Sequence, residues 1–81
     1  MKILNYKWYS FWIIEEENFF VAYFNFLDYH WTRREVCITE QQIWHKKVYI
    51  AKFSWLTTEY IGTLEEVLDK VIADYNQNQV Q

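Results

Sequence analysis

The residue types most often found in metal sites and nucleophilic centres are scarce in this chain, and they stand far apart. The two histidines and the single cysteine are His30, Cys37 and His45, separated by seven and eight residues. Zinc sites place their ligands at short spacings such as C-x2-C or H-x3–5-H, which these residues do not match. A nucleophilic cysteine needs a base and an electropositive surrounding, but the expected neighbours Glu35 and Lys52 cancel in charge. We therefore predict no metal, no cofactor and no cysteine chemistry.

A run of three carboxylates, Glu15-Glu16-Glu17, is the strongest candidate for acid–base chemistry. Neighbouring residues of a strand point to opposite faces, and this run is expected at an exposed hairpin tip, where solvent surrounds it. The one glycine, Gly62, excludes a glycine-rich loop that would hold a phosphate. We therefore expect a protein that is not an enzyme.

Two basic pairs, Arg33-Arg34 and Lys46-Lys47, are the candidate contacts to a charged partner. An open sheet with aromatic residues and a basic rim is how some RNA-binding domains stack bases. These pairs fall at opposite ends of two expected strands, and the net charge of −3 works against phosphate binding. Nucleic-acid binding is therefore the alternative and not the first hypothesis.

The stretch from Gly62 to Tyr75, GTLEEVLDKVIADY, has the pattern of an amphipathic helix. Thr63 and Glu66 have the spacing of a capping box, in which each side chain accepts a hydrogen bond from the other residue's backbone. Apolar residues recur at helical spacing on one side: Leu64, Val67, Leu68, Val71, Ile72 and Tyr75. Charged residues take the opposite side: Glu65, Glu66, Asp69, Lys70 and Asp74. We predict a helix over about 63–76, followed by a polar tail at 77–81.

Segments rich in aromatic and β-branched residues predict four strands, at 6–14, 19–27, 33–40 and 47–56. In the first hairpin Glu17-Asn18 is the expected two-residue loop, which sets Trp12 opposite Tyr23. Side chains then alternate between two faces. One of these faces is apolar and is predicted to lie under the helix: Tyr9, Phe11, Ile13, Phe20, Ala22, Phe24 and Phe26.

In the second hairpin, Ile38 is expected opposite Tyr49, and Glu35 across from Lys52, with 41–46 as a longer connection. Residues 57–61 are expected to lead into the helix. The fold prediction is a single α+β domain over 1–81: a four-stranded antiparallel meander at about 6–56 with the C-terminal helix across one face. No apolar run is long enough to span a membrane, and a targeting segment is not recognisable, so we expect a cytoplasmic protein that does not bind membranes.

Aromatic residues make up 22% of the chain, with five Trp, seven Tyr and six Phe. A helix of about 14 residues is roughly 21 Å long and covers only one face of such a sheet. Large residues expected on the uncovered face are Tyr6, Trp8, Trp12, Ile14 and Tyr23. We predict that they bind a protein partner or a second copy of the chain; the alternative is that loops fold over them and bury them.

Two segments, IIEEENFFVAYF at 13–24 and GTLEEVLDKVIADY at 62–75, together resemble the small HicB-type antitoxin domain. That family has an acidic first hairpin, a "YVAYF"-like second strand and a "GDTLEEAL" helix start. Its Pro-Gly-Cys after the second strand is replaced here by residues that include Leu27, Asp28 and Tyr29. The resemblance implies an inhibitory binding module, which agrees with the first hypothesis of a small non-enzymatic accessory, inhibitor or adaptor.

Overall fold

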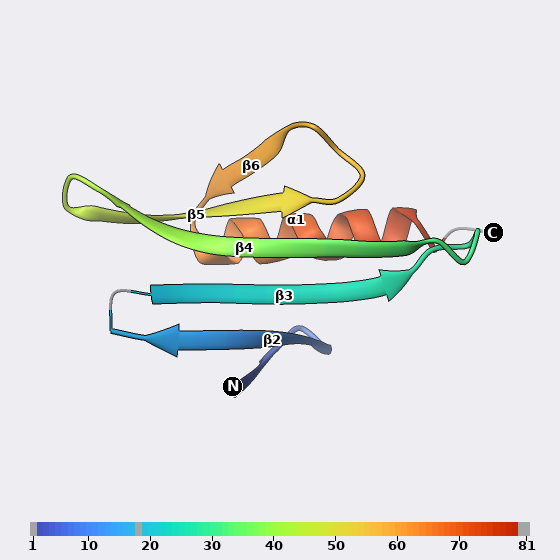
Figure 1. Ribbon diagram of the computed structural model, residues 1–81, viewed down its shortest axis with the longest axis horizontal. Coiled ribbons are helices and arrows are strands. Elements are labelled where there is room, and N and C mark those ends of the chain that lie inside the picture. The colour runs from blue at the N-terminus through green and yellow to red at the C-terminus, as the bar shows by residue number, and fades with distance from the viewer. Residues whose placement is uncertain (1, 18, 80–81) are drawn as a thin grey trace.

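The computed structural model describes residues 2–17 and 19–79, over which the chain forms an antiparallel sheet of six strands with one helix against one face (Figure 1). The strands are β1 (Lys2–Tyr6), β2 (Tyr9–Glu16), β3 (Phe19–Leu27), β4 (Arg33–Ile43), β5 (Lys46–Phe53) and β6 (Glu59–Gly62), and the helix is α1 (Leu64–Gln77). They lie in the sheet in chain order, so every connection joins neighbours. The α+β class, the antiparallel sheet and the C-terminal helix agree with the prediction, but the predicted number of strands was wrong.

The predicted first strand is divided by a tight turn at Lys7 and Trp8. These residues have φ values of 48° and 73°, and Tyr6 lies opposite Tyr9 across the turn. Positive φ at both central residues is what a two-residue type I′ hairpin turn requires, and Asn-Gly usually supplies it. Lysine and tryptophan are not typical of such turns. The predicted strand at 6–14 therefore continued the alternation of side chains through residues that in fact form a turn.

The second hairpin also differs from the prediction. β4 and β5 run to a tight turn at Trp44, with φ of 58°, in place of the longer connection at 41–46. Ala51 lies opposite Ile38, where Tyr49 was expected. Because this register error is two residues and side chains alternate with period two, every side chain keeps its predicted face.

Two further features at the end of the sheet differ from the prediction. Glu35 does not lie across from Lys52: its Oε1 is 3.0 Å from Nη2 of Arg33, whereas Nζ of Lys52 is 3.6 Å from Oε2 of Glu59. Glu59 belongs to β6, which occupies most of the segment that was expected to be a simple lead into the helix.

The core lies between the sheet and α1, on the face that the first hairpin predicted. Trp12 faces Tyr23 and Ile13 faces Ala22, as predicted for that hairpin. The strands contribute these buried side chains to the core: Phe11, Ile13, Phe20, Ala22, Phe24, Val36, Ile38, Ala51 and Phe53. Burial of each large apolar side chain stabilises the fold by about 1.5–3 kcal/mol.

The helix begins as predicted. The hydroxyl of Thr63 accepts a hydrogen bond from the N–H of Glu66 at 3.2 Å, and Oε1 of Glu66 accepts one from the N–H of Thr63 at 2.9 Å. A Cβ at Gly62 would lie 2.9 Å from that same Oε1, so a larger residue there would displace the Glu66 side chain from its position in the capping box. Val67, Leu68 and Val71 are buried, which confirms the apolar stripe. Asp74, predicted on the outer side, is instead buried, and its Oδ1 lies 3.2 Å from Nζ of Lys70.

Candidate protein-binding face

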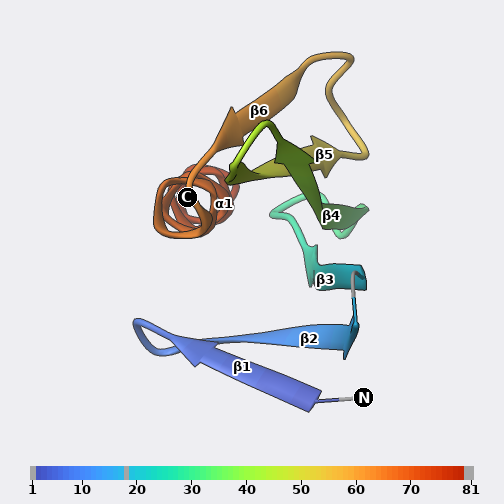
Figure 2. The ribbon, with the colours of Figure 1, turned by 90° about the vertical axis from the view of Figure 1, so that its left-hand side faces the viewer.

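The face of the sheet opposite α1, which we call the open face, carries three of the five predicted partner-binding residues. Figure 2 shows α1 on one side of the sheet only. Trp12, Ile14 and Tyr23 alternate with the buried residues of β2 and β3, and therefore point to the open face.

Tyr6 and Trp8 lie elsewhere, so that part of the prediction was wrong. Tyr6 belongs to β1 and shares the covered face with Leu4; its hydroxyl donates a hydrogen bond to Oδ1 of Asp69 in α1 at 2.9 Å. Trp8 lies in the turn, fully exposed. The reason is the turn at Lys7 and Trp8, which ends the alternation that had grouped both residues with Trp12.

Apolar side chains cross the open face in two neighbouring rows, which follow from the strand registers. One row, from β2 to β6, contains Ile14, Val21, Thr39, Ile50 and Ile61. The next row, from β1 to β4, contains Ile3, Trp12, Tyr23 and Cys37. We call these nine residues the apolar band.

The side chains of the band differ in exposure. Ile3 is 53% exposed, Trp12 51%, Tyr23 39% and Ile61 59%, whereas Val21 is 7% exposed although the helix lies on the other side of the sheet. Neighbouring side chains of the band therefore shelter Val21. A loop over the band would have buried Trp12 and Tyr23, and their exposure argues against that alternative.

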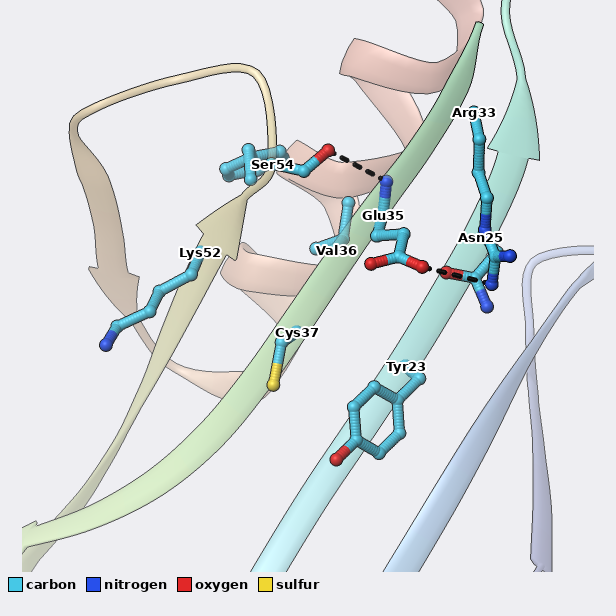
Figure 3. Close-up of a pocket in the computed structure, with 9 residues that line it drawn as sticks. Tyr23, Asn25, Arg33, Glu35, Val36, Cys37, Lys52 and Ser54 are labelled. Atoms are coloured by element: carbon cyan, nitrogen blue, oxygen red, sulfur yellow. Dashed lines mark hydrogen bonds and ion pairs between the residues drawn. The ribbon is translucent and has the colours of Figure 1, made fainter.

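Beside the band lies a hollow of ≈ 440 Å³, lined by Tyr23, Cys37, Lys52 and neighbouring residues. Figure 3 shows Tyr23, Glu35 and Cys37 on the hollow side of β3 and β4, whereas Val36 points toward the helix. Burial raises the pKa of the Cys37 thiol, and the charge of Lys52 offsets this only in part. The thiol is therefore protonated at neutral pH, which makes it a packing residue and not an activated nucleophile.

Three of the four predicted basic-rim residues are held by carboxylates. Arg33 pairs with Glu35, and Nζ of Lys47 lies 3.9 Å from Oε1 of Glu40. Nε of Arg34 donates to Oδ2 of the buried Asp28 at 2.8 Å, and its guanidinium lies 5.4 Å from the ring centre of Trp55. Lys46 is exposed beside the β4–β5 turn. The rim is thus divided between separate ion pairs and forms no continuous basic surface.

Exposed tryptophans at turns were missed by the sequence analysis. Trp31 in the β3–β4 loop and Trp44 in the β4–β5 turn have φ values of 63° and 58° and are exposed, like Trp8. Positive φ in bulky residues is unusual. The chain contains one glycine and no proline, and that shortage was the available signal that ordinary residues would occupy such positions.

Asp28 fixes the β3–β4 loop. Its Oδ1 accepts hydrogen bonds from the N–H groups of His30 at 2.8 Å and Thr32 at 2.9 Å, in addition to the bond from Arg34. Burial by itself would raise the pKa of this carboxyl, but the bonds from Thr32, His30 and Arg34 together lower it. The carboxylate is therefore a structural anchor.

Two observations concern other kinds of site. Within residues 2–17 and 19–79, no group of three His, Cys, Asp or Glu side chains is placed to hold a metal ion. In the same part of the chain, the helix is too short to cross a membrane.

Comparison with protein-family models, with curated proteins and with solved structures finds no match to this chain. Of the two segments that resemble the HicB-type domain, the first lies in β2 and β3, and the second runs from the end of β6 into α1. β4, β5 and most of β6 lie between them. The inhibitory role implied by that resemblance stays a prediction.

Proposed function

We propose that this chain is a non-enzymatic protein-binding module and that the apolar band is its binding surface. The observation that carries the proposal is the pair of apolar rows across the open face, with Trp12 and Tyr23 directly opposite each other at their centre. Tryptophan and tyrosine dominate the residues whose loss most weakens protein complexes.

The size of the band supports this role. An aromatic side chain presents about 150–250 Å², so the exposed parts of Trp12 and Tyr23 contribute on the order of 200 Å². With the exposed isoleucines, the band reaches the roughly 300–600 Å² of the largest patches on ordinary monomers, which are often functional. A partner would cover the band and the surrounding polar rim to reach about 800 Å² per side.

The charges around the band favour a partner with an apolar centre. Lys52 and Glu59 pair with each other at one margin, and Arg33 and Glu35 pair at another. Neutralised pairs of this kind contribute little long-range attraction. Affinity through this face should therefore depend only weakly on salt, whereas a nucleic-acid complex would weaken steeply as salt rises.

The experiment compares the double variant Trp12→Ala/Tyr23→Ala with Trp8→Ala. Partners that the wild-type chain captures from its native lysate are identified, purified and titrated against all three proteins by calorimetry. We expect the double variant to bind roughly 30-fold more weakly or worse. Trp8→Ala, which removes an equally large exposed ring outside the band, should bind like wild type.

Circular dichroism of each variant separates lost binding from lost folding. Equal affinity of the double variant and wild type would overturn the proposal. A loss caused by Trp8→Ala, or an affinity that falls steeply with salt, would place the binding surface at the turns or favour the nucleic-acid alternative.

A further inference from the structure

β1 is the outermost strand of the sheet and has β2 on one side only. Figure 2 shows it at the opposite end of the sheet from β6, although Tyr6 at its end reaches Asp69 of α1. Backbone N–H and C=O groups that point away from β2 have no ladder partner within the sheet. An edge of this kind is a template for another strand.

The hairpin turn fixes which groups face outward. Tyr6 and Tyr9 flank the two-residue turn and form its hydrogen-bonded closing pair. Antiparallel ladders alternate hydrogen-bonded and non-hydrogen-bonded pairs, so Leu4 and Lys2 also bond inward, to β2. The backbone groups of Ile3 and Asn5 therefore point out of the sheet.

This edge lacks two features that often prevent strand pairing, proline and a bulge, and its one charged residue, Lys2, lies at the end of the strand. The chain contains no proline, and the pairing of β1 with β2 is continuous over all five residues. The ammonium of Lys2 lies 3.6 Å from Oε1 of Glu15, over β2 and not beyond the edge. The opposite edge, β6, has four residues and leads directly into α1, so it is shorter and partly covered.

We propose that β1 pairs in antiparallel fashion with β1 of a second copy, with the two-fold axis at Leu4. In this register Ile3 of each copy lies opposite Asn5 of the other, and these two pairs exchange four backbone hydrogen bonds. Leu4 meets Leu4, and Lys2 faces Tyr6, so no like charges are opposed. The interface is closed by its own symmetry and leaves no free copy of the same edge.

The axis stands perpendicular to the sheet, so α1 lies on the same side in both copies. The two open faces then join into one surface, with Ile3 and Trp12 of each copy beside the seam. The dimer does not require the proposed function, because its hydrogen bonds are made by backbone groups at the edge of β1, including those of Ile3, and not by the side chains of the band.

The first test is the oligomeric state of the full chain by sedimentation equilibrium, with Ile3→Pro as the variant. Proline at this position removes an outward N–H and no ladder bond to β2. We expect wild type to dimerise and Ile3→Pro to raise the dissociation constant about tenfold or more. Tyr23→Ala, on β3 two strands away from this edge, is the control and should dimerise like wild type. A monomeric wild type, or a dimer weakened by the control and not by Ile3→Pro, overturns the proposal.

Disulfide trapping gives a second test that does not depend on how well the proline variant folds. In a Cys37→Ser background, Leu4→Cys places two thiols opposite each other at the axis, about 4.5 Å apart between Cα atoms, within disulfide range. Asn5→Cys is the control, because its copies are offset by two residues, about 6.8 Å along the strand. Mild oxidation should link Leu4→Cys chains and leave Asn5→Cys chains unlinked. Failure of Leu4→Cys to link, or equal linking of both, overturns the register.

Discussion

The two faces of the sheet place residues of the same kind in opposite roles. Phe11 and Trp12 are consecutive in β2: Phe11 is fully buried beneath α1, and Trp12 is half exposed on the open face. Phe11 packs 4.9 Å from the ring of Phe24, which also meets Tyr75 of the helix at 5.6 Å. Trp12 lies between Ile3 and Tyr23 in the sheet, and it is half exposed because none of the described segments covers it.

The residues of the covered face therefore stabilise the fold, whereas those of the open face remain exposed for binding. On the covered face the aromatic rings pack against the helix, so their burial stabilises the monomer. On the open face the same chemistry remains available to another molecule. The aromatic residues that the helix does not cover lie in two places. Some are on the open face, and Trp8, Trp31 and Trp44 lie at the turns.

The largest expected effect comes from breaking the covered face. Phe11→Ala should lower the free energy of unfolding by about 3–5 kcal/mol, because it opens a cavity in a close-packed core. Trp12→Ala, one residue away on the open face, should cost about 1 kcal/mol or less. Urea denaturation of both variants at one protein concentration measures the two changes. Equal losses would mean that the open face also belongs to the core.

The next effect concerns Tyr49 on the covered face. Burial and the hydrogen bond of 2.7 Å that its hydroxyl donates to Glu40 raise its pKa to about 12. The unfolded chain, with a tyrosine pKa of about 10, loses this proton first. The contribution of Tyr49 is therefore complete below pH 10 and is lost as pH rises toward 12. We expect a loss of about 1–2 kcal/mol after allowance for solvent screening.

Denaturation curves from pH 9 to pH 12 check this prediction. Tyr49→Phe should remove the corresponding part of the pH dependence, because phenylalanine does not ionise. Thr63→Ser, which changes no ionisable group, is the control and should retain the wild-type dependence. An unchanged dependence in Tyr49→Phe would contradict the role assigned to the bond with Glu40.

The smallest effect is expected at the start of the helix that covers the sheet. Thr63→Ala removes the hydroxyl that accepts from the N–H of Glu66 and should cost about 1 kcal/mol. Thr63→Ser keeps the acceptor and should stay near wild type. Thermal denaturation measures both. Dimerisation through β1 should be unchanged, because Thr63 is remote from that edge. A change in the dimer dissociation constant would show that the start of the helix and the β1 edge are coupled.

Several features could be predicted from the sequence because they depend on residues close together in the chain. The capping box joins Thr63 and Glu66, three residues apart, and the helical stripe repeats within each turn. Alternation in 9–14 and 19–26 predicted the covered face, and the predicted register of Trp12 against Tyr23 is also observed; Asn18 of the expected two-residue loop lies outside the described residues. These patterns placed Trp12, Ile14 and Tyr23 on the open face.

Other features depended on turn geometry and strand register, which local residue patterns do not determine. The pairing of β1 with β2 holds Lys7 and Trp8 at positive φ, and this removed Tyr6 and Trp8 from the predicted surface. The register of β4 against β5 is set across the whole sheet, which moved Lys52 away from Glu35.

By itself, then, the sequence determined the periodic elements, the cap of the helix and the apolar character of both faces. The tertiary structure decided where strands break, that Asp74 is buried, and that Arg33, Arg34 and Lys47 are held in ion pairs. The physical reason is that capping and alternation follow from residue spacing alone. The ion pairs of Arg33, Arg34 and Lys47 join residues that are also close in the chain, but they depend on where each turn falls and on the register that the folded sheet selects.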